Sequence, residues 1–216
     1  LFIWTFVVGV VLGAAVMAWG YISFKGNAVL ESKELYVSRN TTYGELIDSL
    51  KPSIKHHLAF DIYAERLGLS ESYKKGHYVV KDGMNVIEIV RMLKLGLQTP
   101  VNVTMNNVKI PAQLAGKLSK QFEADSAEFV QVLTDKALAK KLGFDNPLTM
   151  FSIFIPNTYE FYWTATPEEF VDRMYKEYKR FWTAERDAKR KRSGLNRVEV
   201  VTLASIVYEE TRKVDE

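Results

Sequence analysis

The 216-residue sequence has no cysteine and only three histidines. The absence of cysteine excludes disulfides and thiolate metal ligands, but it does not assign the protein to a redox compartment. The histidines, His56, His57 and His77, are too few and too unevenly spaced for a usual zinc site, since two adjacent residues cannot share one face of a helix. The sequence therefore predicts neither a bound metal nor a cofactor.

Excess charge of one sign is also lacking. The chain has 29 Lys and Arg against 26 Asp and Glu, a formal net charge of +3, which gives no reason to expect a nucleic-acid partner. Basic residues do gather in "RDAKRKRSGLNR", residues 186–197. This run could contact phosphate, an anionic membrane or an acidic glycan, but such runs are more often a solvated helix end and linker.

The first 24 residues contain no charged side chain: "LFIWTFVVGVVLGAAVMAWGYISF". A helix of this length, at ~1.5 Å per residue, spans the ~30 Å hydrocarbon layer of a bilayer. Trp4 lies near one end and Trp19 and Tyr21 near the other, as aromatic residues do at membrane interfaces. The run is also longer than the apolar core of a signal peptide, about 7–15 residues. We predict a single membrane anchor over residues 1–24 and a juxtamembrane linker over 25–33, followed by a soluble body.

Residues 34–99 have the pattern of a compact α+β module. Short strands are predicted at 35–37 and 78–80, with a tight turn at Asp82–Gly83. Helices are predicted after Thr41 or Thr42, across 56–69, and at 86–95, where Gly96 ends the last one. The helix across 56–69 is predicted to be amphipathic, with Leu58, Ile62, Leu67 and Leu69 near one face and Gly68 at its end.

Residues 100–216 predict a second α+β domain. An extended stretch up to Pro111 precedes helices at 113–122 and 126–133 and a turn at Lys140–Lys141. A further helix begins at Thr166-Pro167, where proline suits the first helical position, and runs to about 182. Six aromatic residues lie between positions 151 and 163. Phe151 and Phe154 are predicted in the core. The candidates for stacking on sugar rings, or equally for the core, are Tyr159, Tyr162 and Trp163.

The last helix contains "VTLASIVYEETRKVDE", residues 201–216. At about 100° per residue, Glu210 lies near the middle of an apolar stripe formed by Val200, Leu203, Ile206 and Val207. A carboxylate on a buried face is costly unless it is paired or protonated, and burial would raise its pKa, as a general acid requires. The alternative is a helix end in water with Glu209 and Glu210 both solvated. Spacing alone leaves both readings open.

Three segments, in this order, resemble the endolytic murein transglycosylases (the MltG/YceG-like family), and with the anchor the resemblance covers essentially the whole chain. "GHYVVKDGMNVIEIVRMLKLG" resembles the LysM-like subdomain of the family, where a G-x-Y-x-V-x-x-G-M phrase is typical. "FIPNTYEFYWTATPEEFVDRM" resembles its P-D-T-Y phrase, with Asn157 in place of the aspartate. "VVTLASIVYEET" resembles the catalytic L-A-S-I-[VI]-E-K-E-T helix, with Tyr208 and Glu209 in place of its first glutamate and its lysine. The resemblance implies that Glu210, immediately before Thr211, is the catalytic residue.

By the same resemblance, the protein would be a lytic transglycosylase that cleaves the β-1,4 bond between N-acetylmuramic acid (MurNAc) and N-acetylglucosamine (GlcNAc) within peptidoglycan. The MurNAc C6 hydroxyl attacks in place of water and leaves a 1,6-anhydro end, so one glutamate suffices as acid and base. The implied location is the bacterial cytoplasmic membrane, with the body outside the cytoplasm and peptidoglycan strands and synthases as partners. The catalytic domain of the family continues further, so we expect residues 100–216 to be an incomplete domain. The alternative is a non-catalytic, membrane-anchored glycan-binding or synthase-docking scaffold, which the changes at Asn157 and Tyr208 favour.

Overall fold

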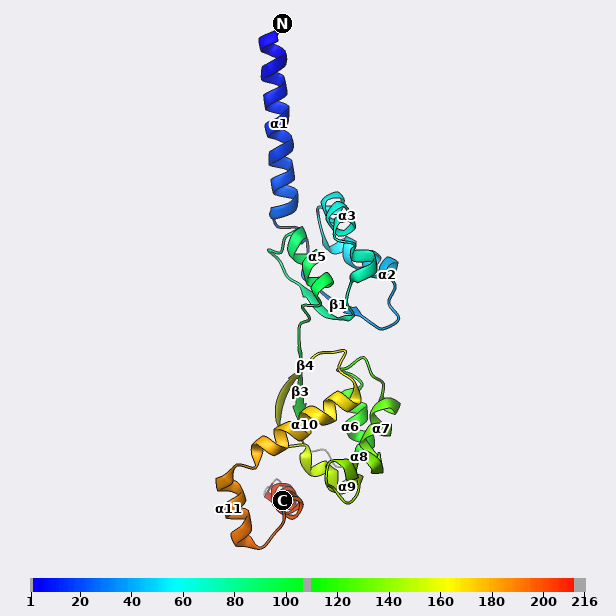
Figure 1. Ribbon diagram of the computed structural model, residues 1–216, viewed down its shortest axis with the longest axis vertical. Coiled ribbons are helices and arrows are strands. Elements are labelled where there is room, and N and C mark those ends of the chain that lie inside the picture. The colour runs from blue at the N-terminus through cyan, green and yellow to red at the C-terminus, as the bar shows by residue number, and fades with distance from the viewer. Residues whose placement is uncertain (1, 107–109, 212–216) are drawn as a thin grey trace. The chain divides into compact units, whose positions relative to one another are not determined.

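A computed structural model describes residues 2–106 and 110–211, and in this range the chain is a mixture of helices and two small antiparallel sheets (Figure 1). It divides into two compact units. The first contains residues 2–100 together with Tyr162–Thr164, and the second contains Val101–Phe161 and the chain from Ala165 onward. The predicted α+β class is confirmed, while the LysM-like character of the first unit stays a prediction.

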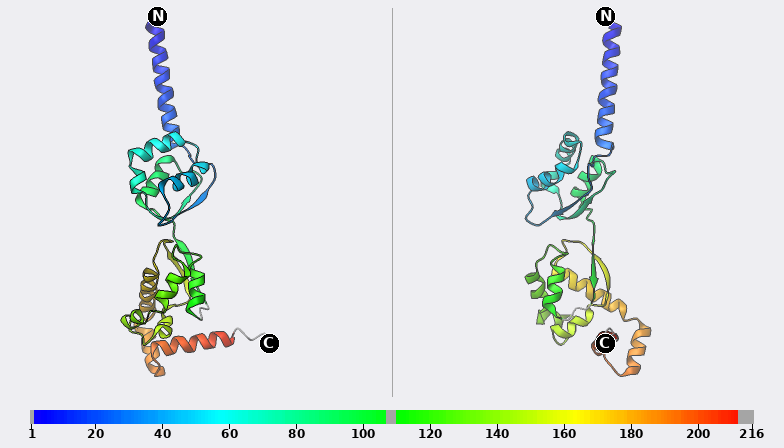
Figure 2. Two further views of the ribbon diagram at one scale, coloured as in Figure 1. Left: turned by 90° about the vertical axis from the view of Figure 1, so that its right-hand side faces the viewer. Right: turned by 180° about the vertical axis from the view of Figure 1, so that it is seen from behind.

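Helix α1 (Phe2–Lys25) is long and apolar enough to cross a membrane over Ile3–Lys25, and none of its most apolar window is buried within the protein. Both views of Figure 2 show it as one continuous helix. Near its C-terminal end Phe24 contacts Tyr63 edge-on, with 6.4 Å between ring centroids. A signal sequence meets the same test of length and composition. The role of α1 as a membrane anchor therefore stays a prediction.

The sheet of the first unit pairs β1 (Lys33–Val37) with β2 (Gly76–Val80), so that Leu35 lies opposite Tyr78. Between the strands come α2 (Tyr43–Leu50), a 3-10 turn (Lys51–Ser53), α3 (His57–Arg66) and α4 (Leu69–Ser72), and α5 (Val86–Leu95) follows β2. Apolar side chains from all these helices and both strands form one core. The strands at 35–37 and 78–80 and the helix at 86–95 are thus confirmed.

Local sequence signals explain why these helices begin and end where they do. At the starts of α2 and α5, the side chains of Thr42 and Asn85 accept a hydrogen bond from the backbone N–H three residues later. That later residue is a glutamate in both helices, and its carboxylate accepts the backbone N–H of the capping residue. Such capping boxes satisfy N–H groups that have no partner inside the helix. Gly96 ends α5 with φ +69°, a left-handed conformation that glycine adopts without steric cost.

The predicted apolar face across 56–69 is buried only in part. Leu69 is buried and Leu67 half-buried, but Leu58 and Ile62 are 60% and 46% exposed. The buried residues of α3 are Ala59, Phe60 and Ala64. Phe60 and Ala64 are four residues apart, so they also lie on one face of the helix. The small alanines let α3 pack closely against its neighbours in the first unit, which turns the larger aliphatic pair to the surface.

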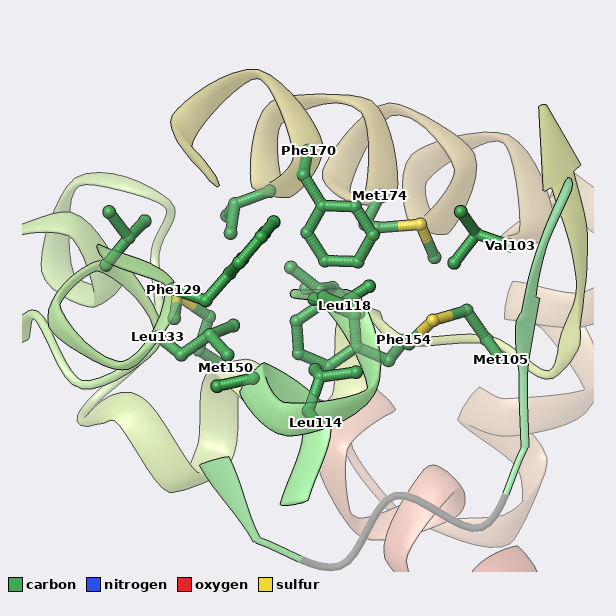
Figure 3. Packing of buried hydrophobic residues seen from close by; sticks show 14 of the residues in the cluster. Val103, Met105, Leu114, Leu118, Phe129, Leu133, Met150, Phe154, Phe170 and Met174 are labelled. Carbon is green, nitrogen blue, oxygen red and sulfur yellow. The ribbon is translucent and has the colours of Figure 1, made fainter. Parts of the chain in front are cut away.

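The second unit pairs β3 (Val101–Met105) with β4 (Asn157–Phe161), with Val103 opposite Tyr159. Helices α6 (Pro111–Leu118), α7 (Ser126–Leu133), α8 (Lys136–Lys141), α9 (Pro147–Met150) and α10 (Pro167–Phe181) pack around this sheet. A 3-10 turn (Phe151–Ile153) precedes β4, and α11 (Ala184–Ser193) and α12 (Arg197–Thr211) follow α10. Phe170 and Met174 extend from α10 toward Phe154 and Leu118 in the core (Figure 3).

Most predicted elements of the second unit are confirmed, with three differences. Lys140–Lys141 lies in the last turn of α8, a helix that the Asp135 side chain caps at its start, and not in a loop. Helix α6 ends at Leu118, four residues earlier than predicted, although Phe122 is still buried. The predicted extended stretch is a strand only at 101–105, and residues 107–109 lie outside the described range. Phe154 is buried and Phe151 half-buried, as predicted for core residues.

Candidate functional site

The helix that carries Glu210 is fixed at its N-terminal end. Asn196 caps α12: its Oδ1 accepts the Glu199 N–H at 2.9 Å, and Glu199 Oε2 accepts the Asn196 N–H at 2.6 Å. Val198, Val200 and Val201 are half-buried against the core of the second unit. The beginning of α12 is therefore held by both a cap and apolar packing.

An ion-pair cluster joins α12 to α11. Asp187 accepts hydrogen bonds from Arg197 Nη2 at 2.6 Å and Nε at 3.0 Å, and from Arg190 Nε at 3.1 Å. The hydrogen bonds from Arg197, followed by those from Arg190, lower the pKa of Asp187 to about 2. Arg190 also donates to the Leu195 carbonyl at 2.8 Å, which fixes the turn between the helices.

Glu210 lies in the last turn of α12, where the structure agrees with the second of the two readings, a carboxylate in water. Its side chain is exposed, and Leu203, Ile206 and Val207 of the predicted stripe are each more than half exposed. Figure 2 shows α12, in red, extending away from the other helices of its unit. Within residues 2–106 and 110–211 nothing covers this apolar face, because only the valines of the first turn reach the core. The catalytic role of Glu210 stays a prediction.

The three predicted sugar-stacking residues do not form one group. Tyr159 belongs to β4 in the second unit, is 7% exposed, and donates its hydroxyl to the Ile155 carbonyl at 2.8 Å. Burial raises the pKa of Tyr159, as it does for a phenol in the core. Tyr162 and Trp163 belong to the first unit, where Tyr162 is 56% exposed and Trp163 is half-buried.

Trp163 lies against a polar and aromatic cluster that sequence reasoning missed. Its ring meets Tyr36 edge-on at 5.3 Å, and Tyr36 stacks on His77 at 4.5 Å. Burial, followed by the hydrogen bond that its hydroxyl donates to Glu34 at 2.9 Å, raises the pKa of Tyr36. The alternation of Glu34 and Tyr36 along β1 was a signal for this outer face, but nothing in the sequence links it to position 163.

A groove of about 430 Å³ opens beside β1 and the start of α2. Its polar lining is Tyr36, Ser38, Asn40, Thr41, Glu45 and Ser49. The backbone N–H and hydroxyl of Thr42 donate to Glu45 and hold the pKa of that carboxyl below its usual range. The groove therefore offers an aromatic edge, a carboxylate, and hydroxyl and amide groups. Across the described residues, no three His, Asp or Glu side chains are grouped as a metal ion would need.

Comparison with known proteins gives a match over most of the chain. The model of the YceG-like family matches residues 35–216. Among solved structures, a YceG-like protein from Listeria monocytogenes is similar, with 17% sequence identity and a TM-score of 0.38 over 76% of this chain. The chain spans 59% of the length of that protein. No curated protein matches the chain.

Proposed function

The chain belongs to the YceG-like family, and from this membership we propose that it acts as a membrane-anchored endolytic lytic transglycosylase on peptidoglycan. The observation that carries the proposal is the family match over residues 35–216, which includes the helix that resembles the family's catalytic helix. Helix α1 would hold the protein in the cytoplasmic membrane, with both units on the outer side, near newly made glycan strands. Peptidoglycan synthases stay predicted partners.

In the proposed reaction Glu210 acts first as an acid and then as a base. It donates its proton to the oxygen that bridges MurNAc C1 and GlcNAc, and this C–O bond breaks. The MurNAc C6 oxygen forms a new bond to C1, and the C6 hydroxyl proton returns to Glu210. The products are a 1,6-anhydroMurNAc end and a free GlcNAc hydroxyl, with no water consumed. The second carboxyl of ordinary glycosidases is therefore not required.

Because Glu210 is exposed, a glycan strand can reach its carboxyl. The same exposure means that α12 alone does not shield the carboxyl from water. An acid that acts in the middle of a polymer must be reachable from outside, and the last turn of α12 is reachable. A glycan strand that covers the half-exposed stripe around Leu203 and Ile206 would exclude water from the carboxyl. Desolvation favours the protonated form that a general acid needs. We propose that binding supplies the burial that α12 alone does not.

We propose that the first unit, as a LysM-like module, holds the glycan strand. The groove beside β1 offers Asn40, Glu45 and their neighbours to sugar hydroxyls, and Tyr36 gives it an aromatic edge. Trp163 meets Tyr36 edge-on, and the exposed Tyr162 is its neighbour in the chain, so both are candidates to stack on sugar rings. Tyr159 is left out of this proposal because its ring is packed in the core and its hydroxyl is bonded to the backbone.

The test is product analysis with a matched pair of variants. The natural protein that carries this chain, its Glu210→Gln variant and its Glu209→Gln variant are each incubated with purified peptidoglycan. Soluble products are identified by mass spectrometry. We expect anhydro-ended products from the natural protein and from Glu209→Gln, and none from a folded Glu210→Gln variant that still binds glycan. Equal activity of the two variants would remove Glu210 from the mechanism.

The scaffold alternative rests on two residues that depart from the family phrases. Tyr208 stands one turn before the end of α12, and Asn157 begins β4, where its side chain accepts the Thr158 N–H at 2.8 Å. A scaffold would bind peptidoglycan without releasing any product. Restoring the family residues in a Tyr208→Glu, Asn157→Asp variant separates the two cases. A gain of activity from nothing would identify the present chain as a scaffold.

A further inference from the structure

Helix α11 is a surface helix with an unusual charge balance. Its residues, Ala184–Ser193, contain five basic and two acidic side chains, a net charge of +3, which equals the +3 of the whole chain, so the remainder sums to zero. None of the residues of α11 is buried. The helix thus contributes almost nothing to the core and displays the whole positive excess of the protein.

Both acidic residues of α11 already form ion pairs with basic residues. Asp187 is bound by Arg190 and Arg197, and Glu185 accepts from Lys189 at 2.7 Å. Lys191 and Arg192 are exposed and have no ion pair with any described residue. Arg186 has no ion pair with a described residue either, but its guanidinium is bound to the Phe181 carbonyl and ring, so Lys191 and Arg192 are the cations that the helix leaves open to solvent.

The helix is held in place despite its lack of buried side chains. The Thr183 hydroxyl accepts the Arg186 N–H at its start, and Gly194, with φ +75°, ends it. The Arg186 guanidinium lies 4.2 Å from the Phe181 ring centroid and donates to the Phe181 carbonyl. These Arg186 contacts fix α11 to the end of α10, and the Asp187–Arg197 pair fixes it to α12, the helix that carries Glu210. The cations are therefore presented on an ordered surface.

The composition of α11 favours a polymer that carries carboxylates over a lipid surface. Helices that lie in a membrane interface have a face of bulky apolar residues, whereas the apolar residues of α11 are Ala184 and Ala188. The planar guanidinium of Arg192 matches the geometry of carboxylates. Resting on the proposed function, we propose that Lys191 and Arg192 of α11 bind the carboxylates of the peptides attached to the glycan strand, beside the strand that reaches Glu210.

The test measures binding, so catalysis is not needed. The natural protein with Glu210→Gln is compared with the same protein carrying Lys191→Gln and Arg192→Gln. The matched control carries Lys140→Gln and Lys141→Gln, two adjacent exposed lysines on α8 of the same unit. Each protein is sedimented with insoluble peptidoglycan, with peptidoglycan from which an amidase has removed the peptides, and with vesicles that contain anionic lipid.

We expect the Lys191→Gln, Arg192→Gln variant to bind intact peptidoglycan roughly three- to tenfold more weakly than the control variant at low salt, as for two exposed ion pairs. The difference should disappear at about 0.5 M salt, where screening is strong, and on peptide-free glycan. An equal loss on peptide-free glycan, or no difference from the control, would overturn the proposal. So would a loss confined to the vesicles, which would identify a membrane-facing surface. Failure of Glu210 in catalysis would leave this result unchanged, so the two proposals fail separately.

Discussion

Phe170→Ala should strongly destabilise the second unit while leaving the stability of the first unchanged. Phe170 is fully buried, and its ring lies 5.2–5.9 Å from those of Phe122, Phe129, Phe154 and Phe161. Truncation removes the apolar side chain and leaves a cavity at the point where α10 meets β4 and α7. For a fully buried phenylalanine this costs about 3–5 kcal/mol. Because single domains are stable by about 5–15 kcal/mol, the loss would leave the second unit marginally stable.

The assay is hydrogen exchange followed by mass spectrometry during a urea titration of the whole chain in detergent micelles. With a urea dependence of about 2 kcal/mol per molar, the midpoint of the second unit should fall by roughly 1.5–2.5 M. Phe60→Ala is the matched control, because Phe60 is fully buried in the core of the first unit and should lower only that midpoint. A change below about 1 kcal/mol in Phe170→Ala, or an equal fall in both units, would refute the described packing.

Three further predictions concern ionisation and capping. Burial raises the pKa of Tyr78 to about 12, so the unfolded chain loses this proton near pH 10 first. Its contribution to stability is complete below pH 10 and is lost as pH rises toward 12, and Tyr78→Phe should remove this alkaline loss in thermal unfolding. Asp187 has its pKa lowered to about 2, so its contribution is present above about pH 4 and is lost as pH falls toward 2. The difference in melting temperature between the natural chain and Asp187→Asn should shrink over that range. Thr166→Ala removes the cap that accepts the Glu169 N–H and should cost about 1 kcal/mol, whereas Thr166→Ser should cost less.

The fold was predicted best where a local signal decides the structure. The bounds of α5 follow from the Asn85 cap and Gly96, and the start of α10 follows from Thr166 and Pro167. It was predicted worst where the buried face of a helix depends on which other elements pack against that helix. In α3, Leu58 with Ile62 and Phe60 with Ala64 both repeat at four residues, and only the surrounding helices decide which pair is buried.

The candidate site shows the same division. The sequence pattern identified α12 and its apolar stripe. Whether the stripe is exposed depends on the elements that pack against it, and hydrophobic periodicity gives no information about those elements. The proximity of Trp163 to Tyr36 joins two positions far apart in the sequence, and no local pattern encodes such a contact. The groove beside β1 likewise arises from the packing of a strand on a helix end.

The most direct test of the proposed reaction is the source of the oxygen at the new MurNAc end. Peptidoglycan is digested by the natural protein in water labelled with oxygen-18, and the released ends are examined by mass spectrometry. Attack by the sugar's own C6 hydroxyl predicts anhydro ends that contain no labelled oxygen. Reducing ends that carry one labelled oxygen would mean attack by water, would require a second carboxyl beside Glu210, and would contradict the account.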